Sequence, residues 1–194
     1  IKIETIMPNR LKIDIDWKGL MVWKMNDKPS VDVRSQWLFG APAQKLAVTV
    51  DATLSRKSEP FPAYKSYVFE NPEVSFSSET KTILEAKLND EGALNFSPAL
   101  SLEQRAPGML KAGLLVKVFE PGGAFSSDYG SIDFSPYSRY IGMRSPELKN
   151  FWDYLETGKT YPMDIVALNP DGKLVGGNTK LTARLYKVQW RWWW

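Results

Sequence analysis

The chain has 194 residues, and 25 Lys or Arg against 22 Asp or Glu give it a net charge of +3. This length suffices for one large domain or two small ones, and the small, mixed charge argues against a nucleic-acid binder. Cys and His are both absent, which excludes disulfides, thiolate or imidazole metal ligands, Cys nucleophiles and Ser-His triads. The composition therefore argues against a hydrolase or a zinc enzyme.

The first part of the chain alternates apolar and polar residues with a period of two, which is typical of β-strands. Residues 11–17 place four apolar side chains on one face and two aspartates and a lysine on the other. Residues 31–34 begin in the same way, and residues 46–54 repeat the pattern. We expect three strands here, each with one buried face.

The second part of the chain predicts further strands at residues 114–119 and 163–168, which are almost continuously apolar. Residues 179–190 alternate again, with Leu181, Ala183 and Leu185 on the apolar face. We therefore expect a strand at each of these three places.

Turn-forming residues separate the predicted strands. Asn89-Asp-Glu-Gly92, Pro121-Gly-Gly123 and Asn169-Pro-Asp-Gly172 combine residues that favour turns with a glycine that accepts a positive φ, and each predicts a hairpin. The one helix candidate is residues 145–155, which begin with an N-cap serine followed by proline. In an all-β protein this segment is equally well explained as an extended loop.

Many short strands joined by turns predict an all-β, antiparallel β-sandwich. Pro136 interrupts the chain before a new apolar run begins. We expect a sandwich domain over residues 1–136, whose first residues belong to a linker, and the N-terminal part of a second β domain over residues 137–194. Because the chain stops inside the apolar run 185–194, we interpret it as a fragment of a longer protein.

Two pairs of carboxylates are candidates for acid–base or calcium chemistry. Asp14 and Asp16 share one face of a predicted strand about 7 Å apart, a spacing that suits a carboxylate pair or a weak calcium site. Glu147 and Asp153 are the second pair that a carboxylate-based glycosidase could use. Because the periodicity assigns these acids to solvent-facing positions, we favour solvated surfaces over a site.

Three short motifs resemble parts of known sites. Ser101-Leu-Glu-Gln104 has the form of a Cys-x-Glu-Gln thioester motif, but Ser cannot supply the sulfur. Asp171-Gly172 belongs to a turn without the downstream Glu of a calcium loop, and Gly40-Ala-Pro-Ala43 is better explained as a corner between strands than as a phosphate cradle. We assign no catalytic, cofactor-binding or metal-ligating residue, and we expect no cofactor.

The C-terminal run is rich in tryptophan. Alternation places Trp190, Trp192 and Trp194 on one face, and Arg191 and Trp193 on the other. Such a surface is typical of a carbohydrate platform or a membrane-interface patch. We favour a core strand whose aromatics pack against a part of the protein outside this chain.

Seven blocks follow one another along almost the whole chain, and their order is more specific than any one of them. They are PNRLKI (8–13), QWLFGAPA (36–43) leading into strand 46–54, PFPAYKSYVF (60–69), VFEPGG (118–123), YIGMR (140–144), NPDGKLVGG (169–177) and LYKVQWRWWW (185–194). Together they resemble the macroglobulin-like domains that precede the bait region in bacterial alpha-2-macroglobulins.

The resemblance implies a non-enzymatic structural segment of a bacterial envelope protein, periplasmic or outer-surface, built from serial macroglobulin-like β-sandwiches. Members of this family act as protease traps: a protease cuts a bait segment, the molecule rearranges, and a thioester binds the attacker. The implied partners are neighbouring domains of the parent chain and target proteases. Nucleic acid is not expected, and a membrane only through a lipid anchor outside this chain. The alternative, motivated by the aromatic excess, is a carbohydrate- or peptidoglycan-binding β-sandwich module.

Overall fold

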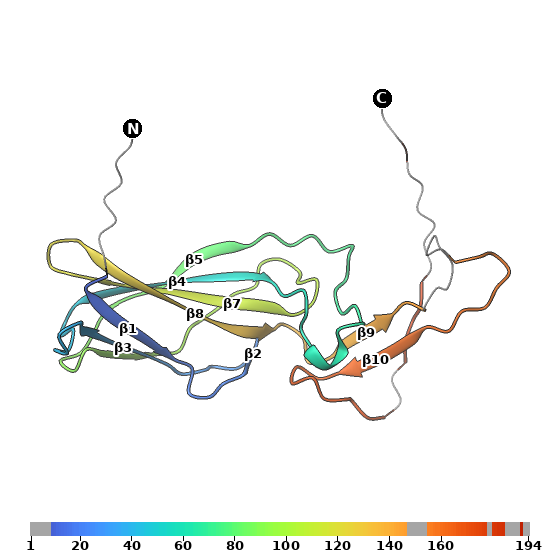
Figure 1. The fold of residues 1–194 in the computed structure, drawn as a ribbon, viewed down its shortest axis with the longest axis horizontal. Helices are drawn as coiled ribbons and strands as arrows, with labels where there is room; N and C mark the ends of the chain where they lie inside the picture. The colour runs from blue at the N-terminus through green and yellow to red at the C-terminus, as the bar shows by residue number, and fades with distance from the viewer. Residues whose placement is uncertain (1–8, 147–154, 178–179, 185–190, 192–194) are drawn as a thin grey trace.

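The computed structural model describes residues 9–146, 155–177, 180–184 and 191. These residues form three β-sheets and one short 3-10 helix (Figure 1). The elements are β1 (Leu11–Asp16), β2 (Val22–Lys24), β3 (Val31–Trp37), β4 (Ala47–Arg56), η1 (Pro62–Tyr64), β5 (Glu79–Lys87), β6 (Ala93–Phe96), β7 (Leu110–Phe119), β8 (Phe125–Ser135), β9 (Tyr140–Arg144) and β10 (Asp164–Leu168). Over the described ranges, no helix combines the length and the apolar character that crossing a membrane requires.

Two of the sheets form a sandwich, which confirms the predicted all-β fold. The larger sheet has the strand order β2-β8-β7-β4-β5 and the smaller one the order β1-β3-β6. Figure 1 shows β1 and β3 in one layer and β4, β7 and β8 in the other. Every strand pair in the two sheets is antiparallel except β2 with β8, which is parallel.

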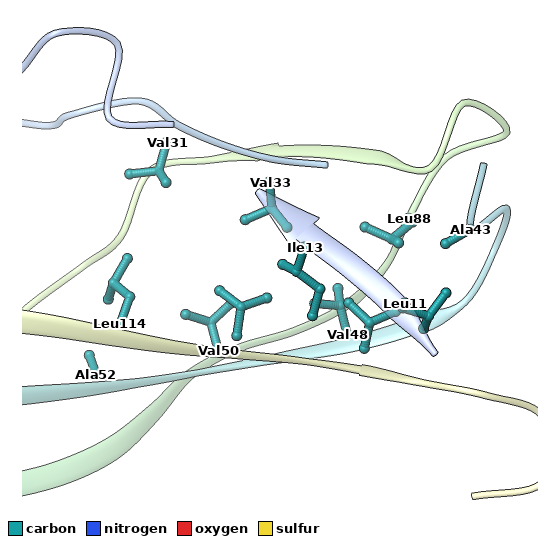
Figure 2. Close-up of a cluster of buried hydrophobic side chains, with 12 residues drawn as sticks. Leu11, Ile13, Val31, Val33, Ala43, Val48, Val50, Ala52, Leu88 and Leu114 are labelled. Carbon is teal, nitrogen blue, oxygen red and sulfur yellow. The ribbon is translucent and has the colours of Figure 1, made fainter. Parts of the chain in front are cut away.

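The main core lies between these two sheets. Figure 2 shows side chains of β1 and β3 directed toward those of β4 and β7. The fully or almost fully buried members include Leu11, Ile13, Val31, Val33, Val48, Val50, Leu114, Val116 and Val118. Each such side chain contributes roughly 1.5–3 kcal/mol by leaving water. The inward faces predicted for residues 11–17, 31–34, 46–54 and 114–119 are therefore confirmed, with Ile15, Trp17 and Leu46 only partly buried.

Two of the predicted turns have the expected local geometry, but only one of them joins paired strands. Gly123, at φ +85°, donates its N–H to the Glu120 carbonyl at 2.9 Å and closes the β7–β8 hairpin. Gly92, at φ +71°, donates to the Asn89 carbonyl at 3.1 Å, but this turn joins β5 and β6, which belong to different sheets. A Cβ on Gly92 would lie 2.4 Å from the Ser35 carbonyl oxygen. The hairpin prediction at Asn89 is wrong because this turn packs against β3, and β6 pairs with β3 instead of β5.

Two C-terminal predictions have different outcomes. Residues 180–184 are irregular and exposed, and they pair with none of the described strands, so the strand predicted over 179–190 is wrong in this part. Alternation alone does not make a strand, because the backbone also needs a paired neighbour. The helix candidate at 145–155 lies mostly in residues 147–154, outside the described residues.

The third sheet consists of β9 and β10 and lies beside η1 at one end of the sandwich (Figure 1). Tyr140 pairs with Leu168 in an antiparallel register that continues to Arg144 and Asp164. One face of this sheet is buried. The other is apolar and exposed at Ile141, Met143 and Ile165.

Candidate functional site

The acidic pair predicted on β1 lies on an exposed strand face. Asp14 Oδ2 lies 3.2 Å from Lys12 Nζ, and both side chains are more than half exposed. Asp16 Oδ1 accepts a hydrogen bond of 2.7 Å from the backbone N–H of Lys18. Both carboxylates therefore have the solvated, lysine-flanked surroundings of a strand surface.

The thioester-like motif Ser101-Leu-Glu-Gln104 lies in the irregular connection between β6 and β7. Gln104 Oε1 accepts a hydrogen bond of 3.2 Å from the backbone N–H of Ser77. Glu103 forms an ion pair with Lys81 of β5. These side chains fasten the loop to β5 and to the segment that precedes it.

The predicted turn after β10 has the expected geometry. Gly172, at φ +75°, donates to the Asn169 carbonyl at 3.0 Å, and Asn169 Oδ1 accepts from the Lys173 N–H at 2.9 Å. Asp171 Oδ2 lies 3.4 Å from Lys24 Nζ of β2. The Asp171 carboxylate is thus in an ion pair beside a turn.

The corner between β3 and β4 is also as predicted. Gly40 adopts φ +96° and donates its N–H to the Trp37 carbonyl at 2.8 Å. The chain crosses here from the smaller sheet to the larger one. Residues 40–43 therefore serve as a strand-to-strand corner.

The remaining candidates lie outside the residues that the structure describes: Glu147, Asp153, Trp190, Trp192, Trp193 and Trp194. Arg191 is described and exposed. Among the described residues, no group of three or more Asp or Glu side chains is placed to hold a metal ion.

A buried apolar cluster links the sandwich to the β9–β10 sheet. Its members come from the β4–β5 connection, from the residue before β7 and from β9 and β10. They are Phe61, Phe69, Met109, Tyr140, Val166 and Leu168, each at most 9% exposed. We call these six residues the aromatic junction.

Phe61 lies at the centre of the aromatic junction. Its ring centroid is 4.7 Å from that of Phe69 and 5.4 Å from that of Tyr140, and both pairs meet edge to face at 68°. Such pairs contribute about 0.5–1.5 kcal/mol beyond their buried area. Phe61 also precedes η1, where Pro62 fixes the backbone at the start of the helix. The position of the Phe61 ring is therefore fixed both by the backbone that follows it and by the neighbouring rings.

Phe69 packs so closely on β9 that only glycine fits opposite it. A Cβ added to Gly142 would lie 2.4 Å from Phe69 Cε1 and 2.5 Å from Cζ. Beside this contact, the Val68 N–H donates to the Met143 carbonyl at 2.8 Å, and the Met143 N–H donates back at 3.0 Å. The β4–β5 connection thus adds one bridge to the edge of the small sheet.

Tyr140 ties the start of β9 to the end of β8. Its hydroxyl lies 2.6 Å from Ser135 Oγ, and Ser135 Oγ donates to the Tyr137 carbonyl at 2.7 Å, so the Tyr140 hydroxyl donates to the serine. Burial raises the pKa of Tyr140 above the ordinary value of 10.0. The side chain is therefore a neutral hydrogen-bond donor at physiological pH.

Charged contacts surround the aromatic junction. The Arg144 guanidinium lies 5.2 Å from the centroid of the Tyr67 ring, and its Nε lies 3.0 Å from Asp164 Oδ2. Exposed ion pairs of this kind contribute about 0–1 kcal/mol. The buried rings therefore dominate the energy that holds the small sheet against the sandwich.

The aromatic junction offers packing rather than a reactive group. Tyr140 is its only ionisable member, and it is kept neutral. What the arrangement can do is hold two parts of a chain in one orientation and transmit a displacement from one to the other.

Residues 60–69 and 140–144 both belong to the family-like blocks of the sequence, but their contact was not predicted. The signal was present in the connection itself, where four aromatic residues follow one another within nine positions: Phe61, Tyr64, Tyr67 and Phe69. A surface loop rarely carries so much aromatic area unless another element covers it.

Comparisons with known proteins agree with this architecture. A family model described as the bacterial alpha-2-macroglobulin MG5 domain matches residues 9–125, and one described as bacterial macroglobulin domain 6 matches residues 142–194. The alpha-2-macroglobulin homolog of Yersinia pestis is 26% identical over 174 residues, which are 88% of this chain and 8% of that protein.

Solved structures of bacterial alpha-2-macroglobulins share the fold. The native Escherichia coli protein matches with a TM-score of 0.62 and 20% identity over 87% of this chain and 11% of that one. The trypsin-activated E. coli protein matches with a TM-score of 0.62 and 20% identity over 86% of this chain and 12% of that one. The Salmonella protein reacted with methylamine matches with a TM-score of 0.60 and 20% identity over 88% of this chain and 12% of that one. This chain thus spans only 8–12% of the length of these relatives. Because the MG5 model alone covers more than half of its residues, the chain belongs to the bacterial alpha-2-macroglobulin family.

Proposed function

We propose that this chain is a non-enzymatic structural segment of a bacterial alpha-2-macroglobulin-like protein that traps proteases. The aromatic junction carries the proposal. Phe61 and Phe69 lie in the region matched by the MG5 model, and Val166 and Leu168 in the region matched by the domain 6 model, yet all four share one buried cluster. A core shared across both regions suits a part that keeps neighbouring modules in a fixed orientation.

The proposed domains are residues 1–136 and 137–194. Residues 136–139 connect β8 to β9, and the β9–β10 sheet pairs with neither sheet of the sandwich. The exposed apolar face of β9–β10 supports a second domain that is completed by other residues of the parent protein, because two strands alone rarely form a stable sheet. Those residues are proposed as one partner of this chain.

Target proteases are the second proposed partner, reached through the parent protein in the cell envelope. Related structures include the E. coli protein activated by trypsin and the E. coli protein activated by porcine elastase. This chain matches both the native and the trypsin-activated protein with a TM-score of 0.62, so the same fold is found before and after activation. Any membrane attachment would come from a lipid anchor outside this chain.

The test uses the full-length parent protein incubated with trypsin. We expect cleavage within one discrete segment, and we expect the captured trypsin to hydrolyse a small peptide substrate while a large protein substrate is protected. A parent protein carrying Gly142→Ala should protect the large substrate less well, whereas Gly122→Ala, whose added Cβ meets nothing within 4 Å, should behave like wild type. A parent that is neither cut at a discrete place nor shields the large substrate would contradict the protease-trap function.

A further inference from the structure

A cavity lies where the two sheets of the sandwich differ in length. The smaller sheet ends with β6 at Phe96, whereas β4 of the larger sheet continues to Arg56. Beyond β6, the inner face of β4 is covered by the irregular connection to β7, including Leu100 and Leu102, which pack against the buried cluster that contains Leu54. The space left between this connection and the sheet is about 250 Å³.

The mouth of this cavity is formed by β5, an edge strand with charges on its inner face. Glu79 pairs with Leu54, and Lys81 pairs with Ala52. Since Leu54 and Ala52 are buried core residues, their cross-strand partners point to the same side of the sheet. Inward charges are one way in which a sheet edge avoids pairing with another strand. Here they also give a charged opening to a cavity whose lining includes the apolar side chains of Leu54, Leu100 and Leu102.

The charges at the mouth do not balance. Lys81 forms an ion pair with Glu103 of the covering loop, and its Nζ lies 3.5 Å from Glu79 Oε1. The hydrogen bond with Glu103 raises the pKa of Lys81, so the ammonium stays charged. Two carboxylates around one ammonium leave a net charge of −1 at the opening, which favours a cation over an anion.

We propose that this cavity binds an alkylammonium group, with an aliphatic stem against its apolar lining and the cation beside Glu79 and Glu103. A cavity of about 150 Å³ accepts benzene, and sites for drug-sized molecules begin at about 300 Å³, so a stem of four to six carbons suits the available space. A free amine and a lysine side chain of a peptide share this chemistry. The site does not depend on the proposed protease-trap function.

Amide-resolved NMR titrations of the whole chain test the site. Hexylamine should produce saturable shifts at residues that line the cavity, and hexanoate, with the same stem and the opposite charge, should bind at least tenfold more weakly. Nα-acetyl-lysine methylamide, which carries a butylammonium stem on a peptide unit, separates the two sources. Binding comparable to hexylamine would indicate a peptide side chain, and much weaker binding would indicate a free amine.

Two variants with opposite expected signs separate charge from structural damage. Glu103→Gln removes a carboxylate and should weaken hexylamine binding about fivefold, whereas Lys81→Gln removes the competing ammonium and should strengthen it by a similar factor. Glu85→Gln is the matched control, because Glu85 is exposed on the outer face of the same strand and should leave the affinity unchanged.

Three results would overturn the proposal: no saturable shift with hexylamine, equal binding of hexanoate, or weaker amine binding in Lys81→Gln with an otherwise unchanged spectrum. Protection from proteases by the parent protein is measured in a separate assay. Failure of the amine-site proposal can therefore be distinguished from failure of the protease-trap proposal.

Discussion

Substituting Gly142 by alanine perturbs the aromatic junction at its tightest point. The added Cβ would lie 2.4 Å from Phe69 Cε1, 2.5 Å from Cζ and 3.0 Å from Cδ1. Contacts this short require Phe69 or β9 to move. Because Phe69 also lies against Phe61, at 4.7 Å between ring centroids, the ring has little room to retreat.

The expected cost is that of an overpacked core site, about 1–3 kcal/mol. If this free energy destabilises the contact between β9 and the sandwich, the equilibrium constant for local opening increases roughly 5- to 150-fold. The Val68 and Met143 amides report this opening directly, because they form the reciprocal bridge between the β4–β5 connection and β9.

Native-state hydrogen exchange is the appropriate assay, because it resolves local opening from global unfolding. The Val68 and Met143 amides should exchange faster in Gly142→Ala by that factor, while amides in the centre of β7 keep the protection of the wild type. Gly122→Ala should leave all of these rates unchanged, since its Cβ points into open space.

A second substitution tests whether the clash is the cause. Phe69→Leu removes Cε1 and Cζ, so Gly142→Ala should cost less in the Phe69→Leu background than in the wild type. If Gly142→Ala leaves the Val68 and Met143 amides within twofold of wild-type exchange, the close approach of Phe69 to β9 is refuted.

Three further changes have defined outcomes. Tyr140→Phe should lower the free energy of unfolding by about 1 kcal/mol in urea titrations, because it removes the hydrogen bond to Ser135. Since the pKa of Tyr140 is raised in the folded state, the stability of the wild type should also fall as the pH rises above 10. An equally steep fall in the variant would contradict this assignment. The hydrogen bond from Lys117 lowers the pKa of Asp51 below 3.8, so wild-type stability should decrease as pH falls below that value, and Asp51→Asn should show a flatter acid dependence in thermal melts. The exposed apolar face at Ile141, Met143 and Ile165 should cause the isolated chain to self-associate, and Ile165→Lys should reduce this association in sedimentation velocity. An unchanged sedimentation coefficient would argue against this face as an association surface.

The sandwich was predictable because its strands carry their burial pattern locally. Residues 46–54 and 114–119 alternate or run apolar in a way that a two-layer β fold explains, and glycines at 123 and 172 occupy the positive-φ positions of their turns. Each of these signals lies within about ten residues of chain, so periodicity and turn chemistry suffice to find them.

The partners of each strand were not predictable in the same way. The turn at 89–92 has hairpin chemistry, yet its two strands join different sheets, because strand pairing is decided by packing over the whole core. The three-residue β2 is too short to show a period and pairs in parallel with β8. Residues 180–184 alternate without pairing with any strand in the described ranges.

The four aromatic residues of 61–69 indicate that another element covers them, but no local pattern identifies that element, and none predicts the cavity. Phe61 and Tyr140 are far apart in sequence, and only the folded chain brings their rings together. The cavity exists because β6 ends before β4 does, which follows from the relative lengths of two sheets. The composition shows an excess of aromatic residues, and the sequence directed attention to the Trp-rich C-terminal run. Its tryptophans lie outside the described residues.

The central claim is that the sandwich and the β9–β10 sheet are held in one orientation. The chain has no Cys, so Glu91→Cys and Lys173→Cys introduce the only two thiols, one at the β5–β6 turn and one after β10. Pulsed electron–electron double resonance between spin labels attached at these two positions measures the distribution of the distance between the labels. The account predicts one narrow distribution for this background and a broader one when Gly142→Ala is added. A distribution that is already broad without Gly142→Ala would contradict it.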